Sequence, residues 1–143
     1  MTSSIFTFPI RVYWEDTDAG GVVFYANYLK FFERARTEWL RSLGLEQSQL
    51  REQHGGMFVV SEANIQYLRS AKLDDFLHIT AELIELGRTS LTIRQEARLS
   101  KDSVDIVLCK GTVRAGWVNH QTLRPIRIPT AVHALMQSST TPP

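Results

Sequence analysis

Residues 15–28, "EDTDAGGVVFYANY", join a run with the period of a β-strand to a run with the period of a helix. Before them, residues 10–14 alternate Ile, Val and Trp with Arg and Tyr, which predicts a first strand with one apolar face. From Asn27, apolar residues recur at steps of three and four, which predicts a long helix that ends at Gly44. The aspartates and glycines between the two runs form either a capped turn or a reaction centre.

The rest of the chain predicts long strands with no helix between them. Their alternating apolar residues fall in the ranges 57–68, 77–84, 89–100 and 104–119. A strand, a long helix and then a series of strands are typical of an α+β fold with an antiparallel sheet. The helix carries Phe31, Phe32 and Trp39 on its apolar stripe, so we expect the sheet to curve around it.

Shorter features complete the expected fold. Residues 46–54 can form a short helix before a glycine pair, and residues 130–136 can add a helical turn or two. The segment 125–129 lies between two prolines and predicts a short edge strand. Gly111 or Gly116 is expected to mark a bulge or bend in the last long strand.

Composition limits the possible classes of function. The 143 residues, 43% hydrophobic and 22% charged, predict one domain over residues 1–137 and a disordered tail over 138–143. A formal charge of +1 provides no global attraction to nucleic acid or anionic membranes. The start of the chain lacks the pattern of a secretory signal, no run is long enough to span a membrane, and Cys109 has no disulfide partner. We therefore expect a cytoplasmic protein, with Cys109 used for packing.

The segment "DTDAGG" has several possible uses. A calcium loop is disfavoured, because Gly20 replaces an oxygen ligand and Asn27 stands where a bidentate glutamate belongs. A phosphatase-type nucleophile needs a parallel sheet, and an aspartic protease needs a glycine where Asp18 stands. Two interpretations stay open. The carboxylates accept backbone N–H groups in an Asx turn, or one of them acts beside a helix N-terminus that polarises a carbonyl.

Three stretches resemble a known family. They are "RVYWEDTDAGGVVFYANYLKFFERARTEWL" (11–40), "YLRSAKLDDFLHITAEL" (67–83) and "GRTSLTIRQ" (87–95). They are similar to the 4-hydroxybenzoyl-CoA thioesterase-like hotdog family, and most closely to its acyl-CoA thioesterase branch associated with the bacterial Tol-Pal envelope system. The resemblance implies an antiparallel sheet around a central helix, dimers formed through the sheets, tetramers of these dimers, and a site between subunits.

The resemblance also implies roles for individual residues. Asp18 matches the catalytic carboxylate, a nucleophile or a general base, whereas Asp16 is structural. The backbone N–H of Tyr25 matches the group that stabilises the thioester oxygen, and many relatives have a histidine at this position. Arg88 and Arg124 fall where relatives place basic residues near the phosphates of CoA.

The leading hypothesis is hydrolysis of acyl-CoA without a cofactor, and acyl carrier protein is a second possible acyl donor. A hotdog dehydratase would need a histidine beside the acid, and none is near Asp18. A scaffold protein in an envelope or lipid-synthesis complex is the alternative of a different class. The four histidines lack ligand spacing, so we expect no metal site. Phe24, Tyr28 and Phe58 could line an acyl pocket. Glu33 could be a second carboxylate, since some hotdog enzymes place their acid on the central helix, but we expect it to be solvated or paired.

Overall fold

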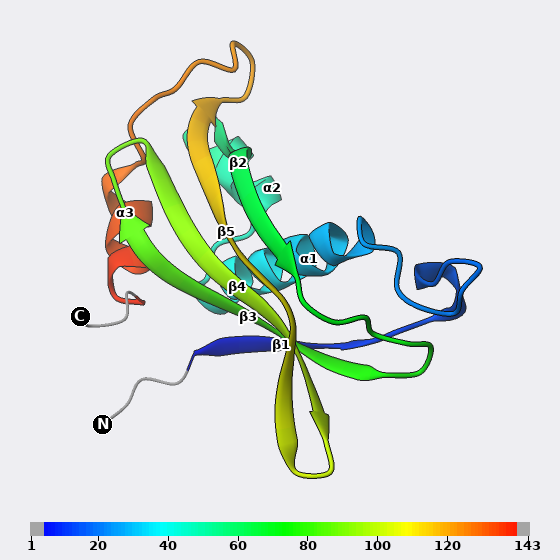
Figure 1. Ribbon diagram of the computed structural model, residues 1–143. Helices are drawn as coiled ribbons and strands as arrows, with labels where there is room; N and C mark the ends of the chain where they lie inside the picture. The colour runs from blue at the N-terminus through cyan, green and yellow to red at the C-terminus, as the bar shows by residue number, and fades with distance from the viewer. Residues whose placement is uncertain (1–4, 140–143) are drawn as a thin grey trace.

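One antiparallel sheet and three helices make up the computed structural model, which describes residues 5–139. In chain order the elements are β1 (Phe6–Arg11), a 3-10 turn (Trp14–Asp16), α1 (Asn27–Ser42), α2 (Gln47–His54), β2 (Gly56–Tyr67), β3 (Phe76–Leu86), β4 (Ser90–Lys101), β5 (Val104–Asn119) and α3 (Thr130–Gln137). The strand order is β1-β3-β4-β5-β2, and every neighbouring pair is antiparallel. The sheet curves past α1 (Figure 1), which confirms the predicted α+β class.

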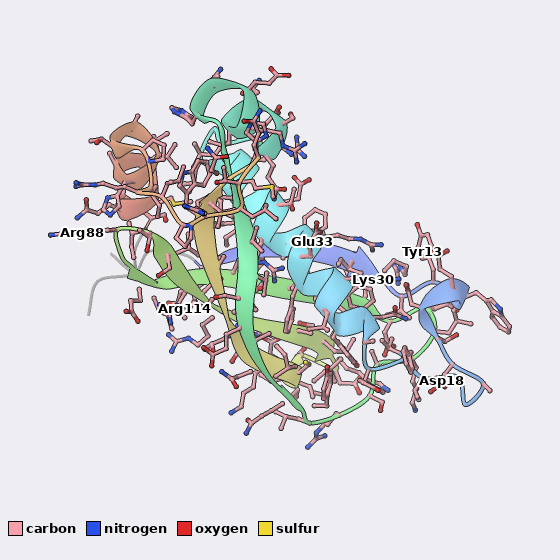
Figure 2. All side chains as sticks on the ribbon, turned by 90° about the horizontal axis from the view of Figure 1, so that it is seen from above. Tyr13, Asp18, Lys30, Glu33, Arg88 and Arg114 are labelled. Atoms are coloured by element: carbon pink, nitrogen blue, oxygen red, sulfur yellow. The ribbon has the colours of Figure 1, made fainter. Side chains whose placement is uncertain are left out.

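The long helix α1 packs against the sheet through one stripe. Its buried residues recur at helical spacing and are Tyr28, Phe31, Phe32, Ala35, Trp39 and Leu40. Gly44 has a φ of +81°, a backbone conformation that few other residues adopt, and it ends the segment where the sequence predicts. The helix is thus held in one orientation, with its N-terminus beside the loop that contains Asp18 (Figure 2).

The inward faces of β3, β4 and β5 form the other half of the core. They present alternate buried residues, which include Leu77, Ile79, Leu83, Leu91, Ile93, Val113 and Trp117. One buried cluster joins the first half of α1 to β1 and β3, and a second joins the end of α1 to α3 through Met136. The amino acids that predict strands by alternation are therefore those that cover α1.

The first strand lies earlier in the chain than predicted. It ends at Arg11, and Trp14 lies in the 3-10 turn with 79% of its surface exposed. The cause is local, because the Asp16 carboxylate accepts the Tyr13 N–H over 2.8 Å and bends the backbone away from the strand direction. The prediction that Trp14 shares an apolar strand face is wrong.

Two other predictions differ from the structure. The segment 125–129 forms no strand, since its only pairing within the described chain is an isolated bridge between Val118 and Pro125. The register shift in the pairing of β2 with β5 falls between Val60 and Glu62 on β2. Gly111 instead permits a close approach, because a Cβ there would lie 2.2 Å from the Asn64 carbonyl oxygen.

The chain after α3 is only partly described. Helix α3 ends at Gln137, where the predicted domain ends. Ser138 and Ser139 follow it, and residues 140–143 of the predicted tail lie outside the described residues. The domain boundary and the tail therefore stay predictions.

Candidate active site

Asp18 lies in a tight turn that its own side chain supports. The Asp18 N–H donates to the Val22 carbonyl oxygen over 2.8 Å, and the Gly21 N–H donates to the Asp18 carbonyl oxygen over 3.0 Å. Its Oδ1 accepts the N–H groups of Gly20 at 2.8 Å and Val22 at 3.4 Å. Gly21 has a φ of +80°, which suits glycine. This is the Asx turn that the sequence suggests.

The turn leaves part of the carboxylate available. Within residues 5–139, Oδ2 of Asp18 has no hydrogen-bond partner, and the side chain is exposed. One oxygen therefore fixes the orientation of the group, while the other is left without a partner among the described residues. The two interpretations of this segment are compatible, because a carboxylate that supports a turn can still act on a substrate through its second oxygen.

Hydrogen bonds anchor the two ends of this loop to each other and to the chain that connects β2 with β3. The Asp16 carbonyl oxygen accepts the Phe24 N–H over 3.1 Å and Nδ2 of Asn27 over 2.8 Å. The Val23 N–H donates to the carbonyl oxygen of Ala71, in the chain before β3. Asp16 is itself buried. Its contacts give it the structural role that the sequence predicts, and they fix the loop beside the start of α1.

The backbone at the start of α1 presents free N–H groups. The N–H groups of Asn27, Tyr28 and Leu29 each donate to the carbonyl oxygen three residues earlier. In the part of the chain that the structure describes, the N–H groups of Tyr25 and Ala26 have no acceptor. Unpaired donors at the positive end of a helix dipole are suited to stabilise negative charge on a substrate oxygen.

Aromatic side chains form a wall between α1 and the end of β2. The Tyr25 ring is exposed and meets the Tyr67 ring edge-on, with centroids 5.7 Å apart. The ring centroids of Tyr28 and Tyr67 are 5.8 Å apart, and the Tyr28 hydroxyl oxygen accepts the Ala71 N–H. Burial raises the pKa of Tyr28, so its hydroxyl stays protonated at neutral pH. The sequence analysis missed Tyr67, for which an aromatic residue at a strand end is the only signal.

Arg88 and Arg124 lie at the other end of the molecule. Arg88 is in the turn between β3 and β4, where its carbonyl oxygen accepts the Ile128 N–H, and Arg124 follows β5 with an exposed side chain. The Asp18 loop joins the chain before β3, whereas Arg88 follows β3, so roughly 35 Å of strand separates them. Figure 2 shows Arg88 and Asp18 at opposite ends. One chain does not bring these residues together, and their predicted role stays untested.

The remaining candidates have simpler roles. Cys109 is fully buried, and burial raises its pKa to about 12, which confirms a packing role over a nucleophilic one. Phe24 is exposed, Tyr28 is buried, and Phe58 packs against Trp117. Glu33 is exposed on α1. Across residues 5–139 no three histidine, cysteine or acidic side chains gather as metal ligands, and no helix is long and apolar enough to cross a membrane.

Known proteins resemble this chain in both sequence and fold. The family described as the Thioesterase superfamily matches residues 20–106. Acyl-CoA thioesterase YbgC of Haemophilus influenzae is 45% identical over 134 residues, which are 94% of this chain and 96% of that protein. Acyl-CoA thioester hydrolase YbgC of Escherichia coli O157:H7 is 41% identical over 114 residues, 76% of this chain and 84% of that protein.

A solved structure agrees in its architecture. The 4-hydroxybenzoyl CoA thioesterase of Pseudomonas sp. strain CBS-3 superimposes with a TM-score of 0.83 over 90% of this chain and 96% of that chain, at 22% identity. At this identity the agreement establishes the shared fold. The resemblance and the hotdog architecture that the sequence predicts are therefore confirmed.

Proposed function

This chain belongs to the thioesterase superfamily, and from that premise we propose that it hydrolyses acyl-CoA thioesters to the free acid and CoA. The observation that supports this most strongly is one anchored loop that carries, among the described residues, both an unpaired carboxylate oxygen, on Asp18, and an unpaired backbone N–H, on Tyr25. Hydrolysis of a thioester needs these two groups, one to attack or activate water and one to stabilise the oxyanion. The relatives that are named acyl-CoA thioesterases support the choice of substrate.

The chemistry follows from the two groups. The substrate carbonyl oxygen accepts the Tyr25 N–H, and negative charge collects there as the carbonyl carbon becomes tetrahedral. Oδ2 of Asp18 either attacks that carbon or takes a proton from a water that attacks it. The carbon–sulfur bond then breaks, and the CoA thiolate leaves and takes up a proton. When Asp18 is the nucleophile, the acyl group remains on its Oδ2 as a mixed anhydride, and water then attacks the acyl carbon, releases the acid and restores the carboxylate. When Asp18 is the base, the attacking water is already part of the acid. Either route consumes one water, so no cofactor is needed.

The site is completed by a second copy of the chain. Asp18 and Tyr25 are exposed, although electrostatic stabilisation of the oxyanion is stronger where bulk water is excluded and only the reacting water remains. Strand β2 lies at the edge of the sheet and exposes Val59, Val60 and Tyr67, which another chain would cover. We propose a homodimer through this edge, which pairs further into a tetramer. Arg88 and Arg124 of a neighbouring subunit would then bind the CoA phosphates.

We further propose a cytoplasmic enzyme, in which CoA and the acyl-CoA pool are the partners of the site. Acyl carrier protein is a second possible acyl donor, because it presents the same thioester. Association with the Tol-Pal envelope system is proposed from the branch that the sequence resembles. We propose neither a nucleic-acid partner nor a membrane span for this protein.

A thiol-release assay tests the proposed function. We expect turnover of at least one member of a panel of short-chain, long-chain and aromatic acyl-CoAs, with the same acyl groups on carrier protein measured beside them. The Asp18→Asn variant serves as the matched control for contaminating activity. Absence of turnover on every member would contradict the proposal and leave the scaffold interpretation.

A further inference from the structure

A single backbone oxygen joins the two parts of the candidate active site. The carbonyl oxygen of Asp16 accepts the Phe24 N–H over 3.1 Å and Nδ2 of Asn27 over 2.8 Å. Asp16 lies two residues before Asp18 in the chain. Phe24 lies directly before Tyr25. Both lone pairs of this oxygen therefore hold the segment with the carboxylate against the turn with the free N–H.

Asn27 completes a ring of three hydrogen bonds around that turn. Its backbone N–H donates to the Phe24 carbonyl oxygen over 2.8 Å, while its side chain reaches Asp16. Since the Phe24 N–H also donates to Asp16, the three bonds form a closed ring that spans Tyr25 and Ala26. The other groups of the ring are all backbone groups. One hydrogen bond fixes a distance, and a second bond to the same oxygen also fixes the orientation of the turn.

This use of Asn27 is unusual for a residue at the start of a helix. Asparagine at an N-cap ordinarily stabilises the helix, because its side chain accepts an N–H of the first turn. The Asn27 amide instead donates to the loop, because the Asp16 carbonyl oxygen can only accept. Ala26, at the N-cap of α1, makes no side-chain capping bond. A helix start that gives up its cap for a loop contact breaks a local rule, and such breaks are expected at functional sites.

Resting on the proposed hydrolysis, we propose that Asn27 is a positioning residue, which holds the Tyr25 N–H in the orientation that the oxyanion needs relative to the Asp18 carboxylate. The reasons are the ring of hydrogen bonds, its single side chain, and the N–H groups within its span that are unpaired among the described residues. Asn27 acts through Tyr25 and needs no contact with the substrate. A displacement of about 1 Å can cost roughly a hundredfold in rate, so loss of this anchor should be visible in catalysis.

Asn27→Leu tests the role, because it removes the donor and keeps a side chain of similar size. We expect kcat for acyl-CoA hydrolysis to fall by about ten- to a hundredfold, less than the roughly 10²- to 10³-fold that complete loss of an oxyanion donor costs. KM should stay within about threefold, because the displaced N–H matters most when charge collects on the substrate oxygen.

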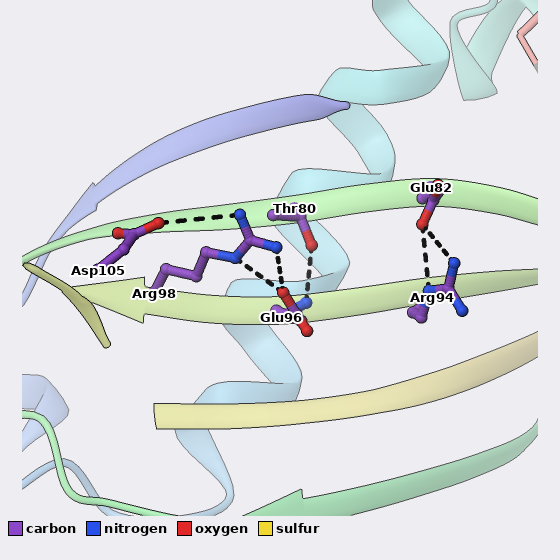
Figure 3. A network of polar contacts seen from close by, with 6 residues as sticks. All are labelled: Thr80, Glu82, Arg94, Glu96, Arg98 and Asp105. Atoms are coloured by element: carbon purple, nitrogen blue, oxygen red, sulfur yellow. Dashed lines mark hydrogen bonds and ion pairs between the residues drawn. The ribbon is translucent and has the colours of Figure 1, made fainter. Parts of the chain in front are cut away.

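Two variants control for the loss of a hydrogen bond as such. Thr17→Val removes a bond of 2.8 Å from its hydroxyl to the Trp14 carbonyl oxygen, in the same loop but outside the ring. Thr80→Val removes the acceptor of the Glu96 N–H, also at 2.8 Å, within the sheet (Figure 3). Both should cost stability, as the loss of a hydrogen bond does, yet lower kcat by less than about threefold. A loss of kcat in both controls as large as in Asn27→Leu would overturn the proposal.

The carbonyl group of a bound ligand reports the position of the donor. Dethia analogues of hexanoyl-CoA and benzoyl-CoA have a methylene group in place of the thioester sulfur, so they keep the carbonyl and cannot be hydrolysed. With an isotope label at this carbonyl, a hydrogen bond from the Tyr25 N–H lowers its stretching frequency in infrared difference spectra. The frequency should be higher in Asn27→Leu than in the wild type, and unchanged in Thr80→Val. An unchanged frequency in Asn27→Leu would refute the positioning role even if kcat fell.

A second variant covers the case in which Asn27→Leu does not fold. Asn27→Asp keeps the shape and loses the donor, and its charge suits the first turn of a helix. We expect the same fall in kcat and the same rise in frequency. Absent turnover in the wild type, with the frequency difference intact, would refute the proposed hydrolysis alone. A wild-type protein that neither turns over acyl-CoA nor binds the analogues would refute both proposals.

Discussion

The Phe24 N–H donates to the Asp16 carbonyl oxygen over 3.1 Å, and this bond closes the loop that carries Asp18 against the first turn of α1. The loop therefore places a carboxylate and the start of a helix next to each other, with the Asn27 side chain as a second link to the same oxygen. Small errors in such a placement are costly in catalysis. The rigid backbone pairing explains how an exposed turn could still support precise chemistry.

CoA binding by the two arginines can be tested through the Michaelis constant. Replacing Arg88 or Arg124 with Ala should raise KM for acyl-CoA more than it lowers kcat, because contacts to remote phosphates persist unchanged through the reaction. The effect should shrink at high salt. Lys101→Ala, at the exposed end of β4, is the control. An equal loss on an acyl-pantetheine that lacks the nucleotide would rule the assignment out.

The state of assembly is a direct consequence of the exposed edge of β2. We expect sedimentation at micromolar concentration to show at least a dimer, with a tetramer as the favoured form, because a long unpaired edge strand with apolar residues is a surface for pairing. A monomer that still turns over acyl-CoA at this concentration would contradict both the assembly and the shared site.

Gly56 should be sensitive to the addition of a single methyl group. A Cβ there would lie 2.4 Å from the ring of Trp117, which is fully buried. We expect Gly56→Ala to lower the free energy of unfolding by about 1–3 kcal/mol, as overpacking does. Gly116→Ala is the matched control on β5, because its Cβ would meet only the Thr89 carbonyl oxygen at 3.9 Å. Equal stability of both variants in urea unfolding would show that the Trp117 ring shifts to make room for the added methyl group, which would contradict this prediction.

Burial of Cys109 predicts a loss of stability in alkali. Its pKa is raised from the ordinary 9.0 to about 12, so only the unfolded chain loses the thiol proton between these values. The protonated thiol makes its full contribution to the free energy of unfolding below pH 9. That contribution is lost as the pH rises from 9 to about 12, by at most about 1.4 kcal/mol for each pH unit. Between pH 8 and 10, Cys109→Ala should lose less stability than the wild type in denaturant titrations. If the wild type and Cys109→Ala lose the same stability as the pH rises, the Cys109 thiol must also ionise in the folded state.

Periodicity predicts much of this fold because each long element buries one face. The alternation in residues 104–119 matches β5, and the spacing that begins at Asn27 matches α1. The prediction that Trp14 belongs to the first strand failed for a local reason. The Asp16 carboxylate accepts a hydrogen bond from the Tyr13 N–H, and the backbone turns away from the strand there. That hydrogen bond depends on one side chain, which the pattern of apolar residues does not register.

The candidate site is harder to predict from sequence. Asp18 can be selected from its local pattern and from the family resemblance, whereas Gln95 is a polar residue within the otherwise apolar buried face of β4, and its Oε1 accepts a hydrogen bond from Nη1 of Arg36 on α1. The signal at Gln95 is its position, which falls in the buried alternation of β4 between Ile93 and Ala97. What such a residue contacts depends on how α1 crosses the sheet, and a period within one element carries no information on that crossing.

The central claim assigns different kinds of atom to the two residues of the loop. The carboxylate of Asp18 acts through its charge, whereas Tyr25 acts through its backbone N–H. Asp18→Asn keeps the shape of the side chain and the acceptor for Gly20, so folding and assembly should be unchanged. Tyr25→Phe removes only the hydroxyl, and the backbone donor remains.

The most direct measurement is therefore kcat/KM of these two variants on the same acyl-CoA. Asp18→Asn should lower it by roughly 10²- to 10⁴-fold, as loss of a general base does. Tyr25→Phe should lower it by less than about tenfold, below the roughly 10²- to 10³-fold that loss of an oxyanion donor costs. A full rate for Asp18→Asn, or a loss for Tyr25→Phe as large as that of Asp18→Asn, would contradict the account.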